Sequence, residues 1–259
     1  MNIHGFINHN SICYLNSILQ CLLSCSKFVK LIVKLRDEYK NANNKLGEAF
    51  LKLILKNAKK DNETPYMPIE INKIMRMDGQ QCAAEMLLKI IEDLKLENLF
   101  EQKIEKTFYC MNCNNIVSVK KDVSYIYNFS ETDISNNFTK KINMNCNYID
   151  DYECNKCHKK TKLIILNSLE LVNEIFIISF NKYMKKDLID FPEEIFLTNK
   201  KIKYELVGII DHVGNLSGGH YWAQIKRNDK YYHADDSTIR PINNFEKLKN
   251  NFILFYQKI

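Results

Sequence analysis

The spacing of apolar residues changes partway along the chain, and this change limits the possible folds more than any other feature. Over roughly the first hundred residues, apolar side chains recur every three or four positions, which is typical of amphipathic helices. After Phe108 they recur in short runs, some with two-residue alternation, which is typical of strands. The sequence therefore predicts an α+β fold, with a helical first part and a β-rich remainder.

Three helices are expected in the first part, at residues 14–23, 46–58 and 83–94. Thr64 to Pro68 contains two prolines and is expected to be a loop. Strands are expected at residues 117–123, 162–166, 175–180, 204–210, 221–226, 230–233 and 252–257. The polar stretch Asn145 to Asp151 is expected to be a loop. The length of 259 residues allows one or two domains, and no repeat or long linker divides the chain.

Composition excludes several functional classes. Of the 259 residues, 46% are hydrophobic and 26% charged, which is ordinary for a globular protein. The net charge is +6, but basic and acidic residues are interspersed, so we expect no nucleic-acid partner. No apolar run approaches the roughly 20 residues of a membrane span, and Met1 to Gly5 does not resemble a secretory signal. We therefore expect a protein that lies inside the cell, in the cytoplasm, the nucleus or both, without a membrane partner. We also expect a monomer.

The nine cysteines indicate a metal site rather than disulfides, because disulfides are rare inside cells. Two C-x2-C pairs are separated by 40 residues, and each pair can hold one edge of a tetrahedral Zn²⁺ site. The predicted ligands are Cys110, Cys113, Cys154 and Cys157. His158 is a competing ligand, although four cysteines already complete the shell. A zinc ribbon alone would also suit nucleic-acid binding. The cysteines expected to be unliganded are Cys21, Cys25, Cys82 and Cys146.

Cys13 lies just before the first predicted helix, which begins around Tyr14. Unpaired N–H groups and the partial positive charge at a helix N-terminus favour a thiolate and lower the pKa of a cysteine. A thiolate there is suited to nucleophilic attack on a carbonyl carbon. The side-chain amide of Asn8, five residues earlier, is placed to donate to the oxyanion of acyl transfer. Taken alone, these two residues fit a buried structural thiol and a turn residue better than a catalytic pair.

A second group of polar residues lies near the C-terminus. His220 follows Gly218 and Gly219 at the start of a predicted strand, and glycines there allow the backbone to approach a substrate tail closely. A hairpin would bring Asp235, fifteen residues later, beside His220. An aspartate on one imidazole nitrogen fixes the tautomer and leaves the other nitrogen to accept a proton. A structural histidine is the alternative reading of these residues alone.

The segment from Gly5 to Gln20 resembles the cysteine box of the ubiquitin-specific proteases, which reads roughly G-L-x-N-x-G-N-T-C-Y-M-N-S-x-L-Q. The box departs from the family where Asn10 replaces a glycine, Ser11 an asparagine and Ile12 a threonine. Asparagine tolerates the left-handed backbone region, so the turn is expected to persist. The matching residues are Gly5, Asn8, Cys13, Tyr14, Asn16, Ser17, Leu19 and Gln20.

Three further segments extend this resemblance. The region from residue 208 to 242 resembles the family's histidine box, which implies that His220 is the base, Asp235 its partner and Asp236 a second acid. The cysteine pairs match the fingers subdomain, where zinc is structural. Residues 79–86 resemble the glutamine box, in which Glu85 matches the family glutamate and Cys82 replaces an aspartate. The residues that the resemblance places at the substrate are Glu85, Cys82, His212 and Gly219.

The resemblance implies a papain-like cysteine peptidase domain with a helical thumb, zinc-ribbon fingers and a β-rich palm. These parts are expected at about residues 1–105, 106–170 and 171–259. The implied reaction is hydrolysis of the isopeptide or peptide bond after the C-terminal glycine of ubiquitin, with ubiquitin or ubiquitinated proteins as partners. Two alternatives remain open at this point. Cys82 leaves room for another ubiquitin-like modifier, and a catalytically silent ubiquitin-binding module would keep the same boxes.

Overall fold

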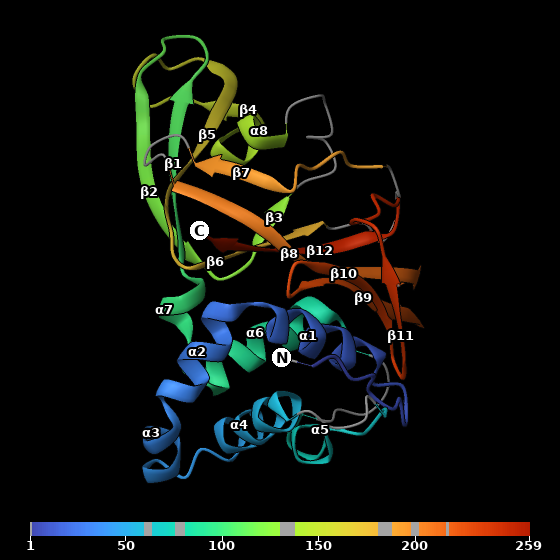
Figure 1. Cartoon of the computed structure of the whole chain (residues 1–259). Coiled ribbons are helices and arrows are strands. Elements are labelled where there is room, and N and C mark those ends of the chain that lie inside the picture. The colour runs from blue at the N-terminus through green and yellow to red at the C-terminus, as the bar shows by residue number, and fades with distance from the viewer. Residues whose placement is uncertain are drawn as a thin grey trace.

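The computed structural model describes residues 2–59, 64–75, 81–129, 138–180, 188–197, 202–215 and 218–259. Helices occupy the first hundred residues and form the lobe in the lower half of Figure 1. The three predicted helices are confirmed as α1, α4 and α6, each within about two residues of its expected bounds. The lobe contains α1 (Cys13–Ser24), α2 (Ser26–Lys34), α3 (Arg36–Asn41), α4 (Lys45–Ala58), α5 (Ile69–Met75), α6 (Ala83–Asp93) and α7 (Glu97–Phe100).

Helix α1 is the central element, because every residue from Cys13 to Leu23 is buried. It packs between the other helices and the large sheet, and its apolar side chains share one core with α4, α6 and strand β9 (Gly218–Arg227). A helix buried on all sides places its N-terminus inside the protein rather than in solvent. Cys13, the first residue of α1, is therefore held at the boundary between the helical lobe and the sheet.

A four-stranded antiparallel sheet rises from the rest of the molecule in Figure 1. Its order is β2 (Ile116–Ser124), β1 (Gln102–Cys110), β5 (Lys160–Val172) and β4 (Met144–Glu153), with α8 (Phe138–Asn143) beside it. The loop predicted for Asn145 to Asp151 is wrong, because these residues belong to β4. Most of β4 is exposed, so its polar composition reflects an edge strand held by backbone pairing with β5.

The larger, eight-stranded sheet carries the C-terminal part of the chain. Its order is β11-β10-β9-β8-β12-β6-β3, with β7 paired to β8. Alternate residues of β9 point toward α1, and Tyr221, Ala223 and Ile225 lie in the core that contains it. The remaining strands are β3 (Tyr127–Phe129), β6 (Ile175–Phe180), β7 (Glu194–Leu197), β8 (Ile202–Asn215), β10 (Lys230–Asp235), β11 (Thr238–Ile242) and β12 (Asn251–Lys258).

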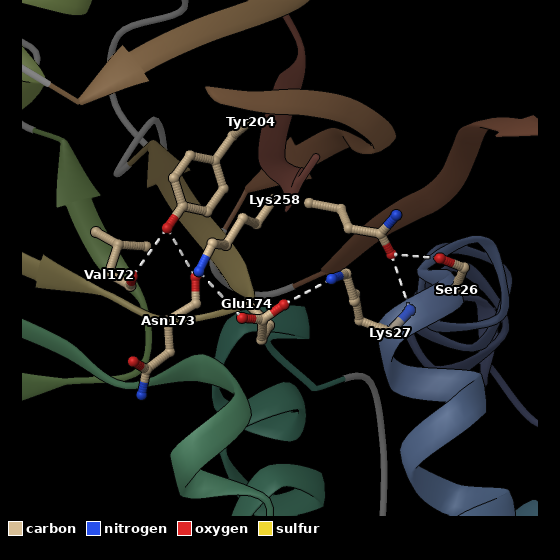
Figure 2. A network of polar contacts seen from close by, with 8 residues as sticks. Ser26, Lys27, Val172, Asn173, Glu174, Tyr204 and Lys258 are labelled. Carbon is tan, nitrogen blue, oxygen red and sulfur yellow. Dashed lines mark hydrogen bonds and ion pairs between the residues drawn. The ribbon is translucent and has the colours of Figure 1, made fainter. Parts of the chain in front are cut away.

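A polar network joins the helical lobe to the region where the two sheets meet (Figure 2). Glu174, between β5 and β6, pairs with Lys27 of α2 at 2.8 Å and with Lys258 of β12 at 3.3 Å. These two ammonium groups, Lys27 foremost, lower the pKa of Glu174. The hydroxyl of Tyr204 donates to the carbonyl oxygens of Val172 and Asn173, each at 2.8 Å. The junction between the two sheets is thereby tied to α2.

Across the described ranges, no single helix has the length and apolar character to cross a membrane. Helices α1 and α2, which meet at an angle of 86°, satisfy the length and composition criteria only when they are counted together.

Candidate functional site

The segment before α1 is held in place by side chains of the helix itself. Asn16 Nδ2 donates to the carbonyl of Phe6 at 3.2 Å, and Gln20 Nε2 donates to the carbonyl of His4 at 2.7 Å. The backbone at Gly5 passes so close to the β10–β11 turn that a Cβ would lie 2.2 Å from the carbonyl oxygen of Ser237. Only glycine fits at that position, and the segment is therefore fixed between α1 and the large sheet.

Two consecutive residues with left-handed backbone lead into α1. Asn10 has φ 64° and Ser11 has φ 61°. The expectation that Asn10 would accept this conformation is confirmed. The left-handed region is unfavourable for residues with a Cβ, although asparagine tolerates it better than most. Ser11 therefore stores more strain than Asn10, directly before the buried end of the helix.

Cys13 is buried, and the expectation of a lowered pKa is wrong. Burial raises the pKa of the Cys13 thiol above its usual value, and the nearby carboxylate of Asp236 adds to this. The backbone N–H groups of Tyr221 and Tyr14 oppose the shift but do not outweigh burial. Desolvation disfavours the charged form of the thiol more strongly than the helix terminus favours it. Because the thiol lies at the N–H of Tyr221, it is beside the strand residue that follows His220.

His220 and Asp235 form the pair that the hairpin was expected to bring together. His220 Nε2 lies 2.7 Å from Asp235 Oδ1, and both side chains are about 40% exposed. The antiparallel pairing of β9 with β10 creates this proximity, because Ala234 is opposite Ala223 and Asp235 follows it. With Nε2 engaged by a carboxylate, Nδ1 is the nitrogen that remains for proton transfer.

Asp236, the second acid of the histidine box, is hydrogen-bonded to the cysteine box. Its carboxylate accepts hydrogen bonds from Asn8 Nδ2 and Asn16 Nδ2, both at 2.8 Å, and its carbonyl accepts from the backbone N–H of Phe6 at 2.7 Å. Burial raises the pKa of Asp236, which the two amide donors and His220 partly oppose. Asn8 Oδ1 also accepts from the backbone N–H of Ile12 at 3.0 Å, so both ends of its amide are fixed. Sequence reasoning gave Asn16 no role, although its match to the cysteine box was a signal.

His212 and Gly219 support the site from within the protein. The ring of His212 is 4% exposed and stacks on Tyr221 at a centroid distance of 4.3 Å. A Cβ at Gly219 would lie 2.3 Å from the carbonyl oxygen of Val213 and 2.5 Å from His212 Nε2. The close backbone approach at Gly219 is thus made to strand β8. Contact of either residue with substrate stays a prediction, and burial makes His212 better suited to holding Tyr221.

A groove runs between α6 and the large sheet. Cys82 is the N-cap residue of α6 and makes no side-chain cap hydrogen bond, while Glu85 is exposed in the first turn. Residues 79 and 80 of the glutamine box lie outside the described residues. The groove brings the two predicted substrate residues onto one surface. Its lining consists of Cys82, Ala84, Glu85, Leu88, Ser124, Ile126, Asn128, Ser179 and Phe252.

The two cysteine pairs meet at the tip of the four-stranded sheet. Cys110 Sγ lies 3.8 Å from Cys157 Sγ, Cys113 Sγ lies 3.9 Å from Cys154 Sγ, and all four sulfur atoms lie within 4.8 Å of one another. Four thiolates at about 2.3 Å from one Zn²⁺ would be separated by roughly 3.8 Å, so the cluster fits a tetrahedral zinc ion. The backbone N–H and the side chain of Asn115 lower the pKa of Cys113 to about 6, which favours the thiolate that binds metal. The pKa of Cys110 is instead raised to about 11, because burial and the Cys113 thiol outweigh the backbone N–H of Cys113.

The sequence profile described as ubiquitin carboxyl-terminal hydrolase matches residues 4–256. Among curated proteins, ubiquitin carboxyl-terminal hydrolase 15 of Schizosaccharomyces pombe is 23% identical, over 96% of this chain and 27% of its own length. The protein of the same name in Saccharomyces cerevisiae is 22% identical, over 96% of this chain and 24% of its own. The chain thus spans about a quarter of the length of these relatives.

Solved structures with the same fold include the deubiquitinating module of SAGA that contains Ubp8. The module bound to ubiquitin aldehyde superposes with a TM-score of 0.81 at 20% identity, covering 99% of this chain and 70% of the other. The module bound to monoubiquitin gives a TM-score of 0.79 at 20% identity, covering 99% and 69%. These similarities confirm the papain-like arrangement of a helical lobe, a small sheet that carries the four-cysteine cluster and a large sheet.

Proposed function

The chain belongs to the ubiquitin carboxyl-terminal hydrolase family, and from this premise we propose that it is a thiol-dependent deubiquitinating enzyme. It hydrolyses the isopeptide or peptide bond after the C-terminal glycine of ubiquitin. One observation carries the proposal. The buried Cys13 thiol lies at the backbone N–H of Tyr221, the residue that follows His220. His220 in turn lies 2.7 Å from Asp235.

In this proposal Cys13 is the nucleophile, His220 the base and Asp235 the residue that orients the base. The raised pKa of Cys13, which burial causes, means that the thiol must transfer its proton during catalysis. The proton moves to His220 Nδ1, while Asp235 on Nε2 stabilises the imidazolium that forms. The thiolate attacks the carbonyl carbon of the terminal glycine, and His220 then returns the proton to the leaving amine. Water, activated by the same histidine, hydrolyses the thioester.

Asn8 is proposed to stabilise the oxyanion of the tetrahedral intermediate. A carboxamide nitrogen carries two hydrogens, and Asp236 engages one of them. The second hydrogen is then oriented by Asp236 and by the bond that Asn8 Oδ1 accepts from Ile12. A preorganised donor stabilises a developing charge without rearrangement in the transition state. Asp236 is thus proposed to orient the side-chain amide of Asn8 toward the oxyanion.

The four-cysteine cluster is proposed to hold one structural Zn²⁺. Its ligands would be Cys110, Cys113, Cys154 and Cys157. The ion would stabilise the tip of the four-stranded sheet and take no part in acyl transfer. We also propose the division into a thumb, fingers and palm at about residues 1–105, 106–170 and 171–259. In this division Glu85 and Cys82 face the ubiquitin tail along the α6 groove, and Gly219 faces it beside His220.

Ubiquitin or ubiquitinated proteins are proposed as partners, with action inside the cell, in the cytoplasm or nucleus. The deciding experiment is covalent labelling by ubiquitin with a C-terminal thiol-reactive group. The wild-type chain should form one adduct, on Cys13, and Cys13→Ala should form none. Cys146→Ser is the matched control, because Cys146 is an exposed thiol on β4 outside the site, and it should label like the wild type. Retention of the adduct in Cys13→Ala would refute the assignment.

A protease for another ubiquitin-like modifier is the second candidate, because Cys82 replaces the acid that the family places against an arginine of the ubiquitin tail. Faster labelling by a modifier other than ubiquitin would favour it. A silent ubiquitin-binding module would instead bind ubiquitin and give no adduct with any of these reagents. The presence of Cys13, His220 and Asp235 together argues against the silent module.

A further inference from the structure

Trp222 is the only tryptophan of the chain, and it lies on the same face of the large sheet as His220. Residues 220 and 222 are alternate positions of β9, so both side chains lie on the same face of the strand, opposite Tyr221 and Ala223. The two rings are stacked, with centroids 6.0 Å apart and planes inclined by 29°. The indole is therefore a direct neighbour of the histidine that is proposed to be the base.

The indole is held by its ring faces rather than by its polar atom. Its Nε1 is buried, and within the described part of the chain it has no hydrogen-bond partner. Buried indole N–H groups usually find an acceptor, and an unpaired one destabilises the folded protein. A phenylalanine or leucine would pack on the same strand without that unpaired group. A tryptophan at this position thus needs a reason other than hydrogen bonding.

A second imidazole, that of His233, also contacts the indole, at a centroid distance of 6.1 Å and an interplanar angle of 32°. Burial lowers the pKa of His233, and the guanidinium of Arg240 lowers it further. His233 therefore stays uncharged near neutral pH. The indole thus contacts both this imidazole and that of His220, which accepts a proton in the proposed mechanism.

We propose that Trp222 is a positioning residue that stabilises the charged form of His220 by a cation–π contact, with the indole face directed at the imidazolium. Indole is the strongest of the aromatic faces for a cation, and a distance of about 6 Å to the ring is within the range of this interaction. Together with Asp235 on Nε2, the indole would favour transfer of the proton from Cys13. This inference rests on the proposed role of His220 as the base.

Other charged and titratable groups lie near His220 and Trp222 and also influence the protonation of His220. Those that face His220 are Asp235 of β10 and Asp236 of the β10–β11 turn, and the Cys13 thiol of α1 lies at the backbone N–H of the adjacent Tyr221. Around the indole, Asp211 of β8 is the cross-strand partner of Trp222, whereas His233 has Arg240 and Glu246 near it. None of these groups is altered by replacing Trp222, so a change in the variant's pH profile reports on the indole itself.

Tryptophan fluorescence tests the contact without any substrate, because Trp222 is the single tryptophan of the chain. A protonated imidazole next to the indole quenches its emission more strongly than a neutral imidazole does. Wild-type emission at different pH values should show a step that is lost in His220→Gln and retained in His233→Gln. Persistence of the step in His220→Gln, or its loss in His233→Gln alone, would overturn the proposal. This outcome does not depend on whether ubiquitin is the substrate.

Kinetics on a ubiquitin C-terminal fluorophore supply the second readout. Trp222→Leu should lower kcat by about two- to fivefold with little change in KM, and Trp222→Phe should lose less, since its ring face remains. The limb of the kcat profile that His220 governs should move to lower pH in Trp222→Leu. Equal losses in the two variants, with unmoved pH profiles and unchanged thermal melting, would show that the indole acts only by filling space.

Discussion

Asn8 and Asp236 are separated by most of the chain, yet Asn8 Nδ2 donates a 2.8 Å hydrogen bond to Asp236 Oδ2. The same carboxylate accepts from Asn16 of α1, also at 2.8 Å. One acid at the β10–β11 turn therefore orients both the loop before the nucleophile and the helix that carries it. The orientation of Asn8, the proposed oxyanion donor, therefore depends on Asp236, which the resemblance to the family identifies only as a second acid.

Asn8 and Asp236 should behave as one unit. Asn8→Ala should lower kcat by about 100- to 1,000-fold with little change in KM, as expected for loss of one oxyanion donor. Asp236→Ala should also lower kcat, because the Asn8 amide loses the group that fixes it. The double variant should lose less than the product of the two single losses, since residues that act through one another are not additive. A double-mutant cycle on a ubiquitin reporter measures this coupling. It would be contradicted if the fold loss in kcat of the double variant equalled the product of the losses of the two single variants.

The pKa of Cys13 predicts how its alkylation varies with pH. Burial raises this pKa above 9.0, so without a base the thiolate is a minor form at neutral pH. In His220→Ala, alkylation of Cys13 by iodoacetamide should rise about tenfold per pH unit and show no plateau below pH ~9. The wild type should react faster at neutral pH, because His220 takes the proton. Mass spectrometry of the Cys13 peptide measures both rates, and a plateau near neutral pH in His220→Ala would contradict the burial effect.

Much of the fold was predictable because periodicity and local motifs encode it. Helices α1, α4 and α6 have strong apolar faces, and β6 is an uninterrupted buried run. The pairing of His220 with Asp235 followed from a short hairpin. Strand β4 was missed because exposed edge strands carry no apolar pattern, and only backbone pairing with β5 makes them visible.

The electrostatics of the site were less predictable than its residues. A helix N-terminus suggested a low pKa for Cys13, but burial depends on tertiary packing around α1 and reversed the sign. The role of Asn16 and the stacking of Trp222 on His220 likewise depend on residues brought together by the sheet. Sequence motifs therefore identify the participants, while the three-dimensional contacts determine their charge states and orientation.

The four-cysteine cluster predicts metal content and local stability. Native protein should contain about one zinc per chain, and Cys110→Ser or Cys157→Ser should lose it. Because structural zinc contributes folding free energy, both variants should expose the tip of the four-stranded sheet to proteolysis. Cys146→Ser is the control, since its thiol is exposed on β4 outside the cluster. Elemental analysis measures the zinc content, and limited proteolysis measures the exposure of the sheet tip. Native protein that is purified without chelator and contains no zinc would contradict the zinc-site assignment.

The left-handed backbone at Ser11 predicts a stabilising substitution. Ser11→Gly should raise the free energy of unfolding, because a residue with a Cβ at φ 61° is disfavoured by about 1–2 kcal/mol. The gain should be smaller than this value, because glycine also has greater conformational freedom in the unfolded chain. Ser11→Ala should give no such gain, since it keeps the Cβ. Urea denaturation compares the three proteins. Equal stability of the glycine and alanine variants would show that φ at residue 11 carries no strain.

Cys82 combines two effects that substitution can separate. It is the N-cap of α6 with extended backbone (φ −72°, ψ 125°) and without a cap hydrogen bond, and it lines the groove that also contains Glu85. Asp or Asn at this position should each cap the helix and raise the free energy of unfolding by about 0.5–2 kcal/mol. Only Asp adds the charge that the family places against an arginine of the ubiquitin tail.

If ubiquitin is the substrate, Cys82→Asp should raise kcat/KM on a ubiquitin reporter by about ten- to a hundredfold, mainly through KM, because hydrogen bonds to charged groups contribute about 1.5–3 kcal/mol. Cys82→Asn, the matched control, should gain stability without that gain in kcat/KM. Glu85 remains exposed in the same groove, so the wild type should already process ubiquitin measurably. A wild type that prefers another modifier, with the order reversed by Cys82→Asp, would instead assign the groove to a modifier tail without the arginine.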